Sequence, residues 1–435
     1  MNSNPDTWYA STTKALPVYP EFEGRGDFDV IVIGGGLAGI TVSLELARRG
    51  KSVALFESQE LAFGASGRNG GFVSAGFAEN IEKIAQRVGF EDARALMALS
   101  QEGTEYVRSA IAQYGMQGVD PVSGWLNVQR YNDAPTMQRR AEYSAEQFGR
   151  QLEYWDTGRV RTRLKSEHYF QGVYDASAFH VNPLSYSMQL AENAIKNGVM
   201  IFHNSHVSGA RRTASGFEVE TSKGTARSEK IVVAGSAYLG RSFPEIRRAM
   251  LPVATHVVTS APFARVPDHA IDFPGAVSDT RRAGNYYRLL PDTGSGVRLL
   301  WGGRITTRTR LPRNLVPTMQ ADIARIYPQL GQIKVDHAWS GLMGYAVHKM
   351  PIIGEFKPGL WVCTAFGGHG LNTTAMGGLI VARAICNEDD RVKLFAPYSA
   401  RWGGGILSRM LIQGSYWYMQ TKDWRDETQL FRLKS

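Results

Sequence analysis

Residues 27–57 read DFDVIVIGGGLAGITVSLELARRGKSVALFE, and this stretch decides the fold class. Residues 28–33 form a short β-branched run that is typical of a buried parallel strand. Residues 37–49 carry apolar side chains at helical spacing, and Gly50 ends that pattern. Residues 52–56 predict the next strand. The stretch therefore predicts a strand, a helix and a second strand that cross over within one parallel sheet.

The glycines between the first strand and the helix have the spacing Gly34-x-Gly36-x-x-Gly39. Gly34 makes the tight turn, Gly36 lets the backbone approach a pyrophosphate, and Gly39 lets the helix pack closely on the strand. The free N–H groups at the start of the helix suit an anion. Glu57 lies 18 residues after Gly39, where its carboxylate can accept hydrogen bonds from ribose hydroxyls and disfavours a 2′-phosphate. We therefore predict binding of a dinucleotide other than NADP.

Length and composition exclude several classes of protein. The chain has 435 residues, 43% of them hydrophobic and 20% charged, so it is expected to form ordered globular structure in two or three domains. The 49 Lys and Arg against 40 Asp and Glu give a net charge of +9. The basic residues are scattered and RNA-binding motifs are absent, so we expect no nucleic-acid partner. The positive net charge is instead expected to attract anionic substrates.

The cysteine and histidine positions indicate neither a metal site nor a disulfide framework. Cys363 and Cys386 form no CxxC pair, and the nine His residues form no HExxH motif. A reducing compartment fits this usage, so we expect a cytoplasmic protein. No run approaches about 18 apolar residues, and residues 1–20 lack a basic region followed by an apolar one. Neither a membrane span nor a secretory signal is therefore expected.

Three later stretches are expected near the first glycine turn. Residues 58–77, SQELAFGASGRNGGFVSAGF, are too rich in small residues for an ordinary third strand of a nicotinamide domain, and such a loop can lie against a planar ring. Residues 230–234 predict a buried strand that ends at Gly235. Residues 360–365 predict another strand, which leads through FGGHGLNTT into a helix. The carboxyl ends of these strands are expected at one edge of the sheet.

The sequence resembles the FAD-dependent D-amino acid oxidase superfamily, also called the DAO or glycine oxidase type. Within it, the nearest likeness is to the subgroup of γ-glutamylputrescine oxidase and L-pipecolate oxidase. The likeness rests on the glycine turn, GASGRNGG at 64–71, NYYRLLPDTGSGVRLLWGGR at 285–304, WSGLMGYAVHKMPIIG at 339–354 and FGGHGLNTT at 366–374. The chain departs from the family pattern at Ser260, Ala346 and His348, which are expected on the substrate side of the site.

The resemblance implies an α/β fold in which a Rossmann-like FAD-binding domain is interleaved with an α+β substrate domain built on an antiparallel sheet. The FAD-binding domain is expected to comprise residues 27–80, 182–241 and 341–390, the substrate domain residues 81–181 and 242–340, and a C-terminal helical tail residues 391–435. The tail is basic and aromatic. It is expected either to pack across the body or to associate with a membrane as an interfacial helix.

The resemblance also implies oxidation of the C–N bond of an amine or an imino or amino acid. In that reaction a hydride passes to flavin N5, water hydrolyses the imine, and hydrogen peroxide forms if oxygen is the acceptor. One alternative is a dehydrogenase of a similar substrate that passes electrons to a membrane quinone. Another is a flavin-binding protein without catalysis. The sequence leaves open the amine, its primary or secondary nitrogen, the stereochemistry and the oligomeric state.

We predict that FAD contacts the first glycine turn, the loop that follows Glu57, and the later strand ends. Backbone N–H groups of the FGGHGLNTT turn are expected to face the flavin carbonyl edge. Both cysteines fit buried positions, so FAD is expected to be noncovalent. The predicted cofactor residues are Gly34, Gly36, Leu37, Ala38, Gly39, Glu57, Ser58, Ser66, Arg68, Asn69, Gly70, Gly71, Val207, Gly235, Gly341, Gly367, Gly368, His369, Gly370, Leu371, Asn372 and Thr373.

Residues 286–288 are expected on a strand that faces the ring and are the first candidates for binding the substrate. Neighbours in a strand point to opposite faces, so Tyr286 and Arg288 share one face and Tyr287 takes the other. A Tyr and an Arg together can bind a substrate carboxylate. His369 is expected either to touch flavin or substrate or to be a hydrogen-bonded structural histidine. The full set of catalytic and substrate-pocket candidates is Tyr286, Arg288, Trp339, Tyr345, His348 and His369.

Overall fold

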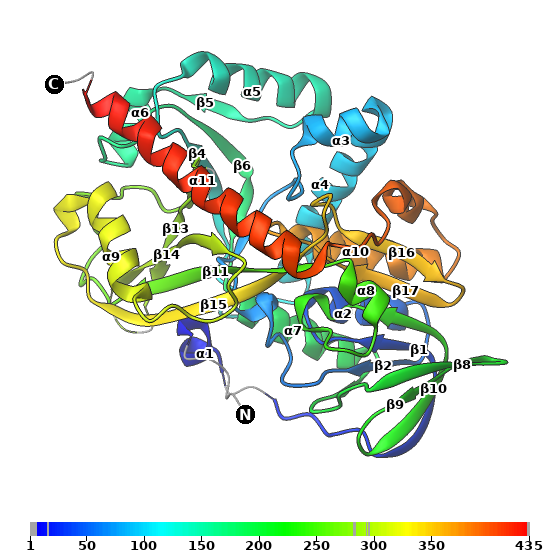
Figure 1. The fold of residues 1–435 in the computed structure, drawn as a ribbon. Helices are drawn as coiled ribbons and strands as arrows, with labels where there is room; N and C mark the ends of the chain where they lie inside the picture. The colour runs from blue at the N-terminus through cyan, green and yellow to red at the C-terminus, as the bar shows by residue number, and fades with distance from the viewer. Residues whose placement is uncertain (1–6, 15–16, 282–283, 293, 295, 433–435) are drawn as a thin grey trace.

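Two β-sheets lie side by side and helices cover them, as Figure 1 shows. The structure is a computed structural model that describes residues 7–14, 17–281, 284–292, 294 and 296–432. Both sheets are assembled from segments that lie far apart in the sequence. The chain therefore crosses between the two sheets several times, and the site at their junction draws residues from many parts of the sequence.

The first sheet confirms the predicted Rossmann-like fold. Its strand order is β16-β17-β10-β1-β2-β7, and the neighbours from β17 to β7 run parallel. A hairpin of β8 and β9 extends β10, and β16 pairs antiparallel with β17. The strands are β1 (Gly24–Ile33), β2 (Val53–Phe56), β7 (Met200–Phe202), β8 (Gly209–Thr213), β9 (Gly216–Glu220), β10 (Gly224–Val233), β16 (Ile352–Lys357) and β17 (Leu360–Thr364).

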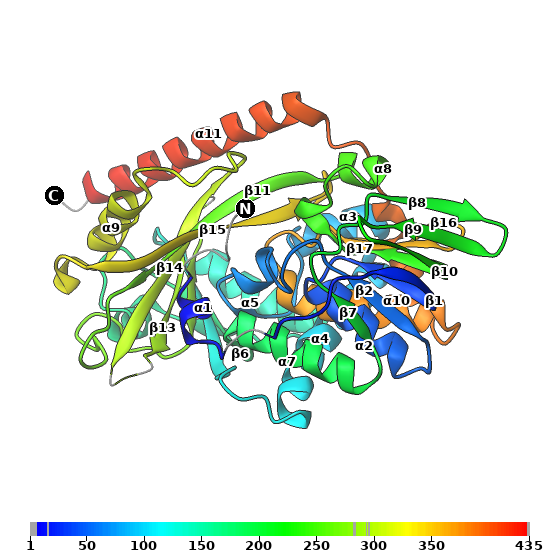
Figure 2. The same ribbon diagram turned by 90° about the horizontal axis from the view of Figure 1, so that it is seen from below.

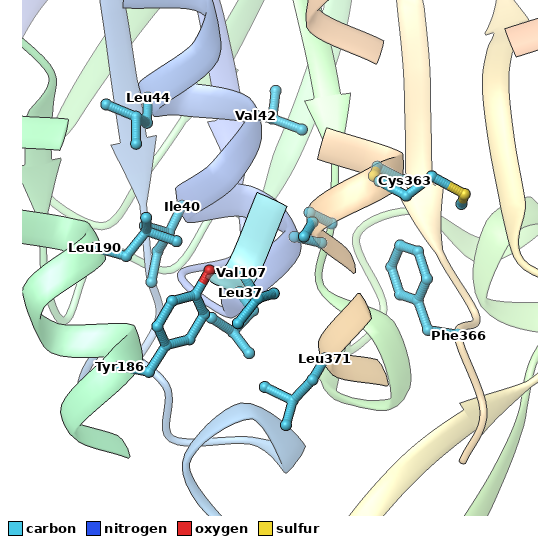
Figure 3. Packing of buried hydrophobic residues seen from close by; sticks show 14 of the residues in the cluster. Leu37, Ile40, Val42, Leu44, Val107, Tyr186, Leu190, Cys363, Phe366 and Leu371 are labelled. Atoms are coloured by element: carbon cyan, nitrogen blue, oxygen red, sulfur yellow. The ribbon is translucent and has the colours of Figure 1, made fainter. Parts of the chain in front are cut away.

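The predicted crossover helix is α2 (Leu37–Ala47), and it is buried on all sides. Figure 3 shows Leu37, Ile40 and Leu44 of α2 near Tyr186 and Leu190, which belong to α7 (Pro183–Lys196). On its other side α2 packs against α10 (Gly370–Ile385), which in turn packs against α4 (Phe90–Gln113). Because apolar residues surround α2, its N-terminus is held rigidly at the end of β1.

The second sheet is antiparallel apart from the parallel pair β12 and β4. Its order is β15-β11-β14-β13-β12-β4-β6-β3, and β5 pairs with β6. One face packs on α9 (Leu315–Ile326) through a core that includes Tyr287 and Trp301. The strands are β3 (Phe72–Val73), β4 (Val122–Val128), β5 (Glu153–Trp155), β6 (Gly172–His180), β11 (Leu251–Ser260), β12 (Ala276–Asp279), β13 (Tyr286–Pro291), β14 (Val297–Thr306) and β15 (Val335–Tyr345).

The two ends of the chain pack on opposite sides of the antiparallel sheet, as Figure 2 shows. The short helix α1 (Trp8–Thr12) lies on one side and α11 (Gly405–Arg432) runs along the other. No helix within the described residues is long and apolar enough to cross a membrane. The remaining helices are α3 (Ile81–Val88), α5 (Ala134–Phe148), α6 (Thr157–Arg163), α8 (Pro244–Arg248) and the 3-10 turns η1 (Ala65–Gly67), η2 (Ser236–Tyr238), η3 (Pro328–Leu330) and η4 (Arg391–Tyr398).

Two strands cross the boundaries predicted for the domains. β3 lies within residues 27–80 but pairs with β6 of the antiparallel sheet. β15 belongs to the antiparallel sheet along its whole length, although the predicted boundary falls at residue 341. A strand next to the junction belongs to the sheet in which its pairing partners lie, and composition does not reveal those partners. The domain division itself stays a prediction.

Candidate functional site

The first glycine turn is built by backbone that packs on backbone. Gly34 follows β1 with φ +112°, a conformation that side chains disfavour. A Cβ on Gly34 would lie 2.8 Å from the backbone nitrogen of Gly235, at the end of β10. A Cβ on Gly39 would lie 2.0 Å from the carbonyl oxygen of Gly34. Both predicted glycine roles, the tight turn and the close helix packing, are therefore visible in the structure.

The N-terminus of α2 faces the loop that follows β2. Gly36 is the N-cap, and the backbone N–H of Leu37 donates to Ser66 Oγ at 2.9 Å. A Cβ on Gly36 would lie 3.0 Å from the same oxygen. Leu37 and Ala38 are buried beneath this contact. Ser66 therefore occupies a predicted cofactor position and serves as a hydrogen-bond acceptor for the helix start.

The Glu57 carboxylate is fixed at the end of β2, beside the glycine turn. Its Oε2 accepts from the Gly35 N–H at 2.7 Å. Its Oε1 accepts from the Gln59 N–H at 2.9 Å and from Ser58 Oγ at 3.1 Å. The segment that leads to the buried Val207 lies alongside, because the Ser205 N–H donates to the Glu57 carbonyl at 2.8 Å. These hydrogen bonds hold the Glu57 carboxylate in one orientation next to the N-terminus of α2.

Asn69 folds the ring-side loop, which we define as residues 64–71. Its Nδ2 donates to the carbonyls of Ala65 at 3.0 Å and Ser66 at 2.9 Å. Its Oδ1 accepts from the Gly71 N–H at 2.7 Å. The Asn69 side chain is therefore used to shape the loop.

Arg68 carries an unsatisfied donor in the same loop. Its Nε is buried and has no hydrogen-bond partner among the described residues. Its guanidinium stacks on Phe63, with Cζ 4.2 Å from the ring centroid, and burial lowers its pKa. The Arg68 backbone carbonyl accepts from Trp339 Nε1 at 2.9 Å, and Gly341 of β15 approaches the Arg68 Cβ. A buried arginine with a free donor fits a ligand that supplies a polar acceptor.

The second glycine turn joins β17 to α10 and packs on Tyr345 at its start. A Cβ on Gly367, which has φ +59°, would lie 2.8 Å from Tyr345 Cε1, and a Cβ on Gly368 would lie 2.9 Å from the Tyr345 hydroxyl. At Gly370, the first residue of α10, a Cβ would meet nothing within 4 Å. The start of α10 therefore faces open space within the chain, where a ligand can approach its backbone.

His369 lies beside this open space. It is half-buried, its ring centroid is 6.2 Å from that of Trp125, and a Cβ on Gly76 would approach it at 3.6 Å. Burial lowers the pKa of His369 to about 4, and Arg150 contributes to the decrease. The imidazole is therefore neutral near pH 7.

The residues that follow His369 face the interior of the fold. Asn372 Nδ2 donates to Ser100 Oγ at 3.1 Å and to the Gly76 carbonyl at 3.2 Å, which joins α10 to α4. Thr373 Oγ1 donates to the carbonyl of His369. Leu371 is buried in the core, as Figure 3 shows. The side chains of these three residues therefore support the turn, and only their backbone remains as the predicted contact to a cofactor.

The face of β13 shows the predicted alternation. Tyr287 stacks on Trp301 with ring centroids 4.6 Å apart, inside the core of the antiparallel sheet. Tyr286 points the other way, where its hydroxyl lies 3.2 Å from Thr255 Oγ1. A Cβ on Gly70 would lie 2.8 Å from the Tyr286 ring. Tyr286 therefore packs directly on the ring-side loop.

Arg288 shares the face of Tyr286, but its terminal nitrogens are bound to protein. Nη1 lies 2.7 Å from His180 Nδ1, and Nη2 donates to the Val181 carbonyl at 2.8 Å and to the Tyr9 hydroxyl at 3.1 Å. Burial lowers the pKa of His180 to about 3, so this ring is neutral and its Nδ1 accepts the hydrogen bond. The Nε of Arg288 is buried and has no partner among the described residues. This geometry favours a positioning role over the predicted role as a carboxylate ligand.

Tyr9 connects Arg288 to the ring-side loop. Its hydroxyl donates to the Asn69 carbonyl at 2.9 Å while it accepts from Arg288, and its ring meets Trp339 edge-on with centroids 5.6 Å apart. Sequence reasoning missed Tyr9 and His180, because neither lies in a motif that contacts the dinucleotide. The adjacent aromatic residues Trp8 and Tyr9 in an otherwise polar N-terminal segment were the one sequence feature that could have indicated a packed position there. Both are buried in the structure.

His348 is held by the backbone around it, away from open space. Its Nδ1 accepts from the Met350 N–H at 3.2 Å, and its Nε2 lies 3.3 Å from the Ser399 carbonyl. Its ring meets Tyr398 of η4 edge-on. Both ring nitrogens contact the protein backbone at hydrogen-bond distance, so His348 is not among the residues that we propose for catalysis. Among the described residues, no cluster of His, Cys, Asp and Glu can hold a metal ion.

Comparisons with known proteins agree with this geometry. The family model described as FAD dependent oxidoreductase, DAO, matches residues 29–384. The chain is 32% identical to the probable oxidoreductase OrdL of Haemophilus influenzae, over 87% of this chain and 88% of that protein. It is 28% identical to gamma-glutamylputrescine oxidoreductase of Escherichia coli, over 94% and 95%. The crystal structure of glycine oxidase from Geobacillus kaustophilus superposes with a TM-score of 0.68, at 24% identity over 86% of this chain and 99% of that one.

Proposed function

The chain belongs to the FAD-dependent oxidoreductases of the DAO family, and from that premise we propose that it oxidises the C–N bond of a small amine or amino acid. Two relatives support this substrate class, because they are named gamma-glutamylputrescine oxidoreductase and glycine oxidase. The proposed products are an imine, which water hydrolyses, and a reduced acceptor. FAD supplies the two-electron chemistry when it is bound, since no side chain in the site provides it.

The observation that carries the proposal is the fit between the glycine turn, Arg68 and FAD. The backbone contacts at Gly34 and Gly39 set the tight turn at the N-terminus of α2, where Gly36 and the backbone beside it would hold a pyrophosphate next to the Glu57 carboxylate. Arg68 Nε is buried without a partner in the adjoining loop. These groups support the proposal as an anion site, a ribose acceptor and a free donor.

The chain's own residues orient the substrate and exclude water. We propose that Tyr286 and His369 line the substrate side, since both are half-buried and lie beside the ring-side loop or the second glycine turn. His369 is neutral near pH 7, so it does not repel the positive charge of a protonated amine that enters the site. Arg288 is proposed to hold the ring-side loop in place through Tyr9.

The test is anaerobic reduction of the purified yellow protein by a panel of amino acids, cyclic imino acids and acylated polyamines. Bleaching of the flavin absorbance by one class identifies the substrate. A protein that keeps its colour with every amine would contradict catalysis and leave the interpretation as a non-catalytic flavin-binding protein. A colourless protein that binds NAD would contradict the cofactor assignment.

Noncovalent binding of FAD is part of the same proposal. Cys363 is buried within β17, and Cys386 lies at the end of α10, where its partly buried thiol faces Lys51 and Glu388. Burial raises the pKa of both thiols, which opposes reaction with a flavin. Acid precipitation should release all the yellow colour into the supernatant. Two free cysteines also support the proposed cytoplasmic location.

The electron acceptor is proposed to be oxygen, with hydrogen peroxide as product. A second candidate is a membrane quinone, because α11 exposes apolar and aromatic side chains to solvent. The peroxide formed per substrate consumed under air distinguishes the two. One peroxide per substrate supports the oxidase, whereas slow reoxidation by oxygen and fast reoxidation by a soluble quinone analogue supports the dehydrogenase.

A further inference from the structure

The helix α11 exposes its apolar side chains. Leu407, Met410, Leu411, Trp417, Tyr418 and Trp424 have exposed fractions between 52% and 75%. Their spacing of three, four and seven residues places them along one side of a helix. We call these six residues the outer stripe. Isolated exposed apolar residues are common on proteins, but a continuous stripe of this length marks an interaction surface.

The side of α11 that faces the protein is held by polar contacts instead. Gln413 is buried, and its Oε1 accepts from Thr306 Oγ1 at 2.7 Å and from the Thr307 N–H at 2.9 Å. Glu427 is buried beside Arg281, whose Nε and Nη2 donate to it at 2.5 and 2.9 Å. This is the reverse of an ordinary surface helix, which buries its apolar side. The outer stripe is therefore not needed to attach α11 to the body.

Arginine side chains surround Glu427 near the C-terminal end of α11. Burial raises the pKa of the Glu427 carboxyl, but Arg130, Arg281 and Arg325 together lower it below the usual range. Glu427 is therefore ionised at neutral pH and stays paired with Arg281 and Arg130. The C-terminal part of α11 is held against the sheet while the outer stripe faces away from it.

Exposed arginines lie on the segments next to α11, and we call Arg308, Arg310, Arg313 and Arg401 the basic rim. The loop after β14 packs on α11 through Thr307, and Arg308 of this loop stacks on Trp417, with Cζ 5.3 Å from the ring. Arg310 and Arg313 of the same loop are exposed, and so is Leu311 between them. Just before α11, Arg401 and Trp402 are exposed as well. Arg308 thus places a basic side chain on the outer stripe, and the two segments next to α11 carry further exposed arginines.

We propose that the outer stripe and its basic rim bind the surface of a membrane that contains anionic lipids. Trp and Tyr favour the interface between headgroups and acyl chains, because one part of each ring system is apolar and another is polar. Arginines beside them attract anionic headgroups. The net charge of +9 adds long-range attraction to such a surface. Two copies of this chain pairing through the same surface would instead bring two basic rims together, which opposes self-association.

Vesicle co-sedimentation tests the proposal with the full-length holoenzyme. The probes are vesicles of phosphatidylcholine alone and of phosphatidylcholine mixed with phosphatidylglycerol. We expect binding to the mixed vesicles, weak binding to phosphatidylcholine alone, and loss of the difference at about 1 M salt, where the screening length falls to about 3 Å. The double variant Trp417→Ser with Tyr418→Ser should lower the partition coefficient at least about tenfold, because two rings no longer insert.

The matched control is Met200→Ser, which removes an exposed apolar side chain at the edge of the first sheet, where Met200 has an exposed fraction of 56%. This variant should bind vesicles like the wild type. FAD content and melting temperature should stay near wild type in both variants, because all three substituted side chains are solvent-exposed. Unchanged binding in the double variant, or no binding to the mixed vesicles, would overturn the proposal. So would a dimer in light scattering that the double variant dissociates, since a second copy would then cover the stripe.

Discussion

At the end of β1, a Cβ on Gly39 would lie 2.0 Å from the Gly34 carbonyl oxygen, whereas on β13 the Arg288 guanidinium reaches Tyr9, His180 and Val181. Both regions contact the ring-side loop, through Ser66 in the first and through Tyr9 in the second. In the first, backbone packs against backbone. In the second, groups from distant segments of the chain are joined by hydrogen bonds to Arg288. The first region therefore tolerates no added atom, while the second is weakened in steps as single partners are removed.

The largest effect is expected from Gly39→Ala. The added methyl group meets a backbone carbonyl that cannot move without displacing the end of β1, so both FAD binding and stability should be lost. The absorbance of bound flavin and a thermal melt measure the two effects. Gly209→Ala is the control, because a Cβ at Gly209 meets nothing within 4 Å. If Gly39→Ala retained FAD, the close packing of α2 on β1 would not be essential.

The next effect is expected from Arg288→Met, on the face of β13. The substitution leaves the Tyr9 hydroxyl, the Val181 carbonyl and His180 Nδ1 with one partner fewer, and we expect a loss of about 3 kcal/mol in the free energy of unfolding. Chemical denaturation measures it. The specificity constant should fall equally for an amino acid and for its amide. A loss confined to the acid would instead identify Arg288 as the carboxylate ligand.

Gly370→Ala separates cofactor binding from folding within the glycine turns. The new methyl group meets nothing within 4 Å in the chain, so the apoprotein should melt like the wild type. The proposed flavin edge approaches the start of α10, so the dissociation constant of FAD should rise at least about tenfold, equivalent to about 1.4 kcal/mol. Titration of apoprotein with FAD measures this. Unchanged affinity would place the cofactor away from α10.

The difference between the two regions also explains what the sequence could predict. The positions of Gly34 and Gly39 follow from local spacing, because a strand, a turn and a helix are adjacent in the chain. Helical periodicity predicted α10 in the same way, and the two-residue period of a strand predicted the alternation of Tyr286, Tyr287 and Arg288. Short-range geometry was therefore predictable from the residues themselves.

The partners of those residues were not predictable. Arg288 lies 279 residues from Tyr9 and 108 from His180, and only the completed fold brings them together. His348 was proposed as catalytic because it stands near a motif, but the turn after β15 packs it on η4. One sequence contains no record of which distant side chains meet, so roles that depend on tertiary partners are the ones that required the structure.

Tyr9→Phe should produce a smaller effect than loss of Arg288. The ring and its contact with Trp339 remain, and only the hydroxyl between Arg288 and the Asn69 carbonyl is removed. Arg288 Nη2 keeps the Val181 carbonyl, so we expect a cost of about 1 kcal/mol in the free energy of unfolding. Hydrogen exchange should show faster opening of residues 64–71. Exchange that stays as slow as in the wild type would mean that α1 does not hold the ring-side loop.

The smallest effect is expected from His369→Gln on the pH dependence of catalysis. Burial lowers the pKa of His369 to about 4, below its unfolded value of about 6.5, so the folded protein holds the ring neutral. Between these values the unfolded chain binds the proton first, so His369 reduces stability as the pH falls from about 6.5 to about 4. Above that window the ring has no proton to gain or lose. Titration of the substrate amine should then set the acidic limb of the kcat/KM profile.

The acidic limb of the kcat/KM profile should therefore stay in place when Gln replaces His369. If His369 acted as a general base, its replacement would remove that limb. The measurement is kcat/KM from pH 5 to 9 for both proteins, with a substrate whose amine pKa is known. Gln keeps a polar side chain beside Trp125 and Gly76, so FAD content serves as the control for the local structure. An acidic limb that disappears in the variant would show that His369 exchanges a proton during turnover. The second glycine turn would then contribute chemistry as well as shape.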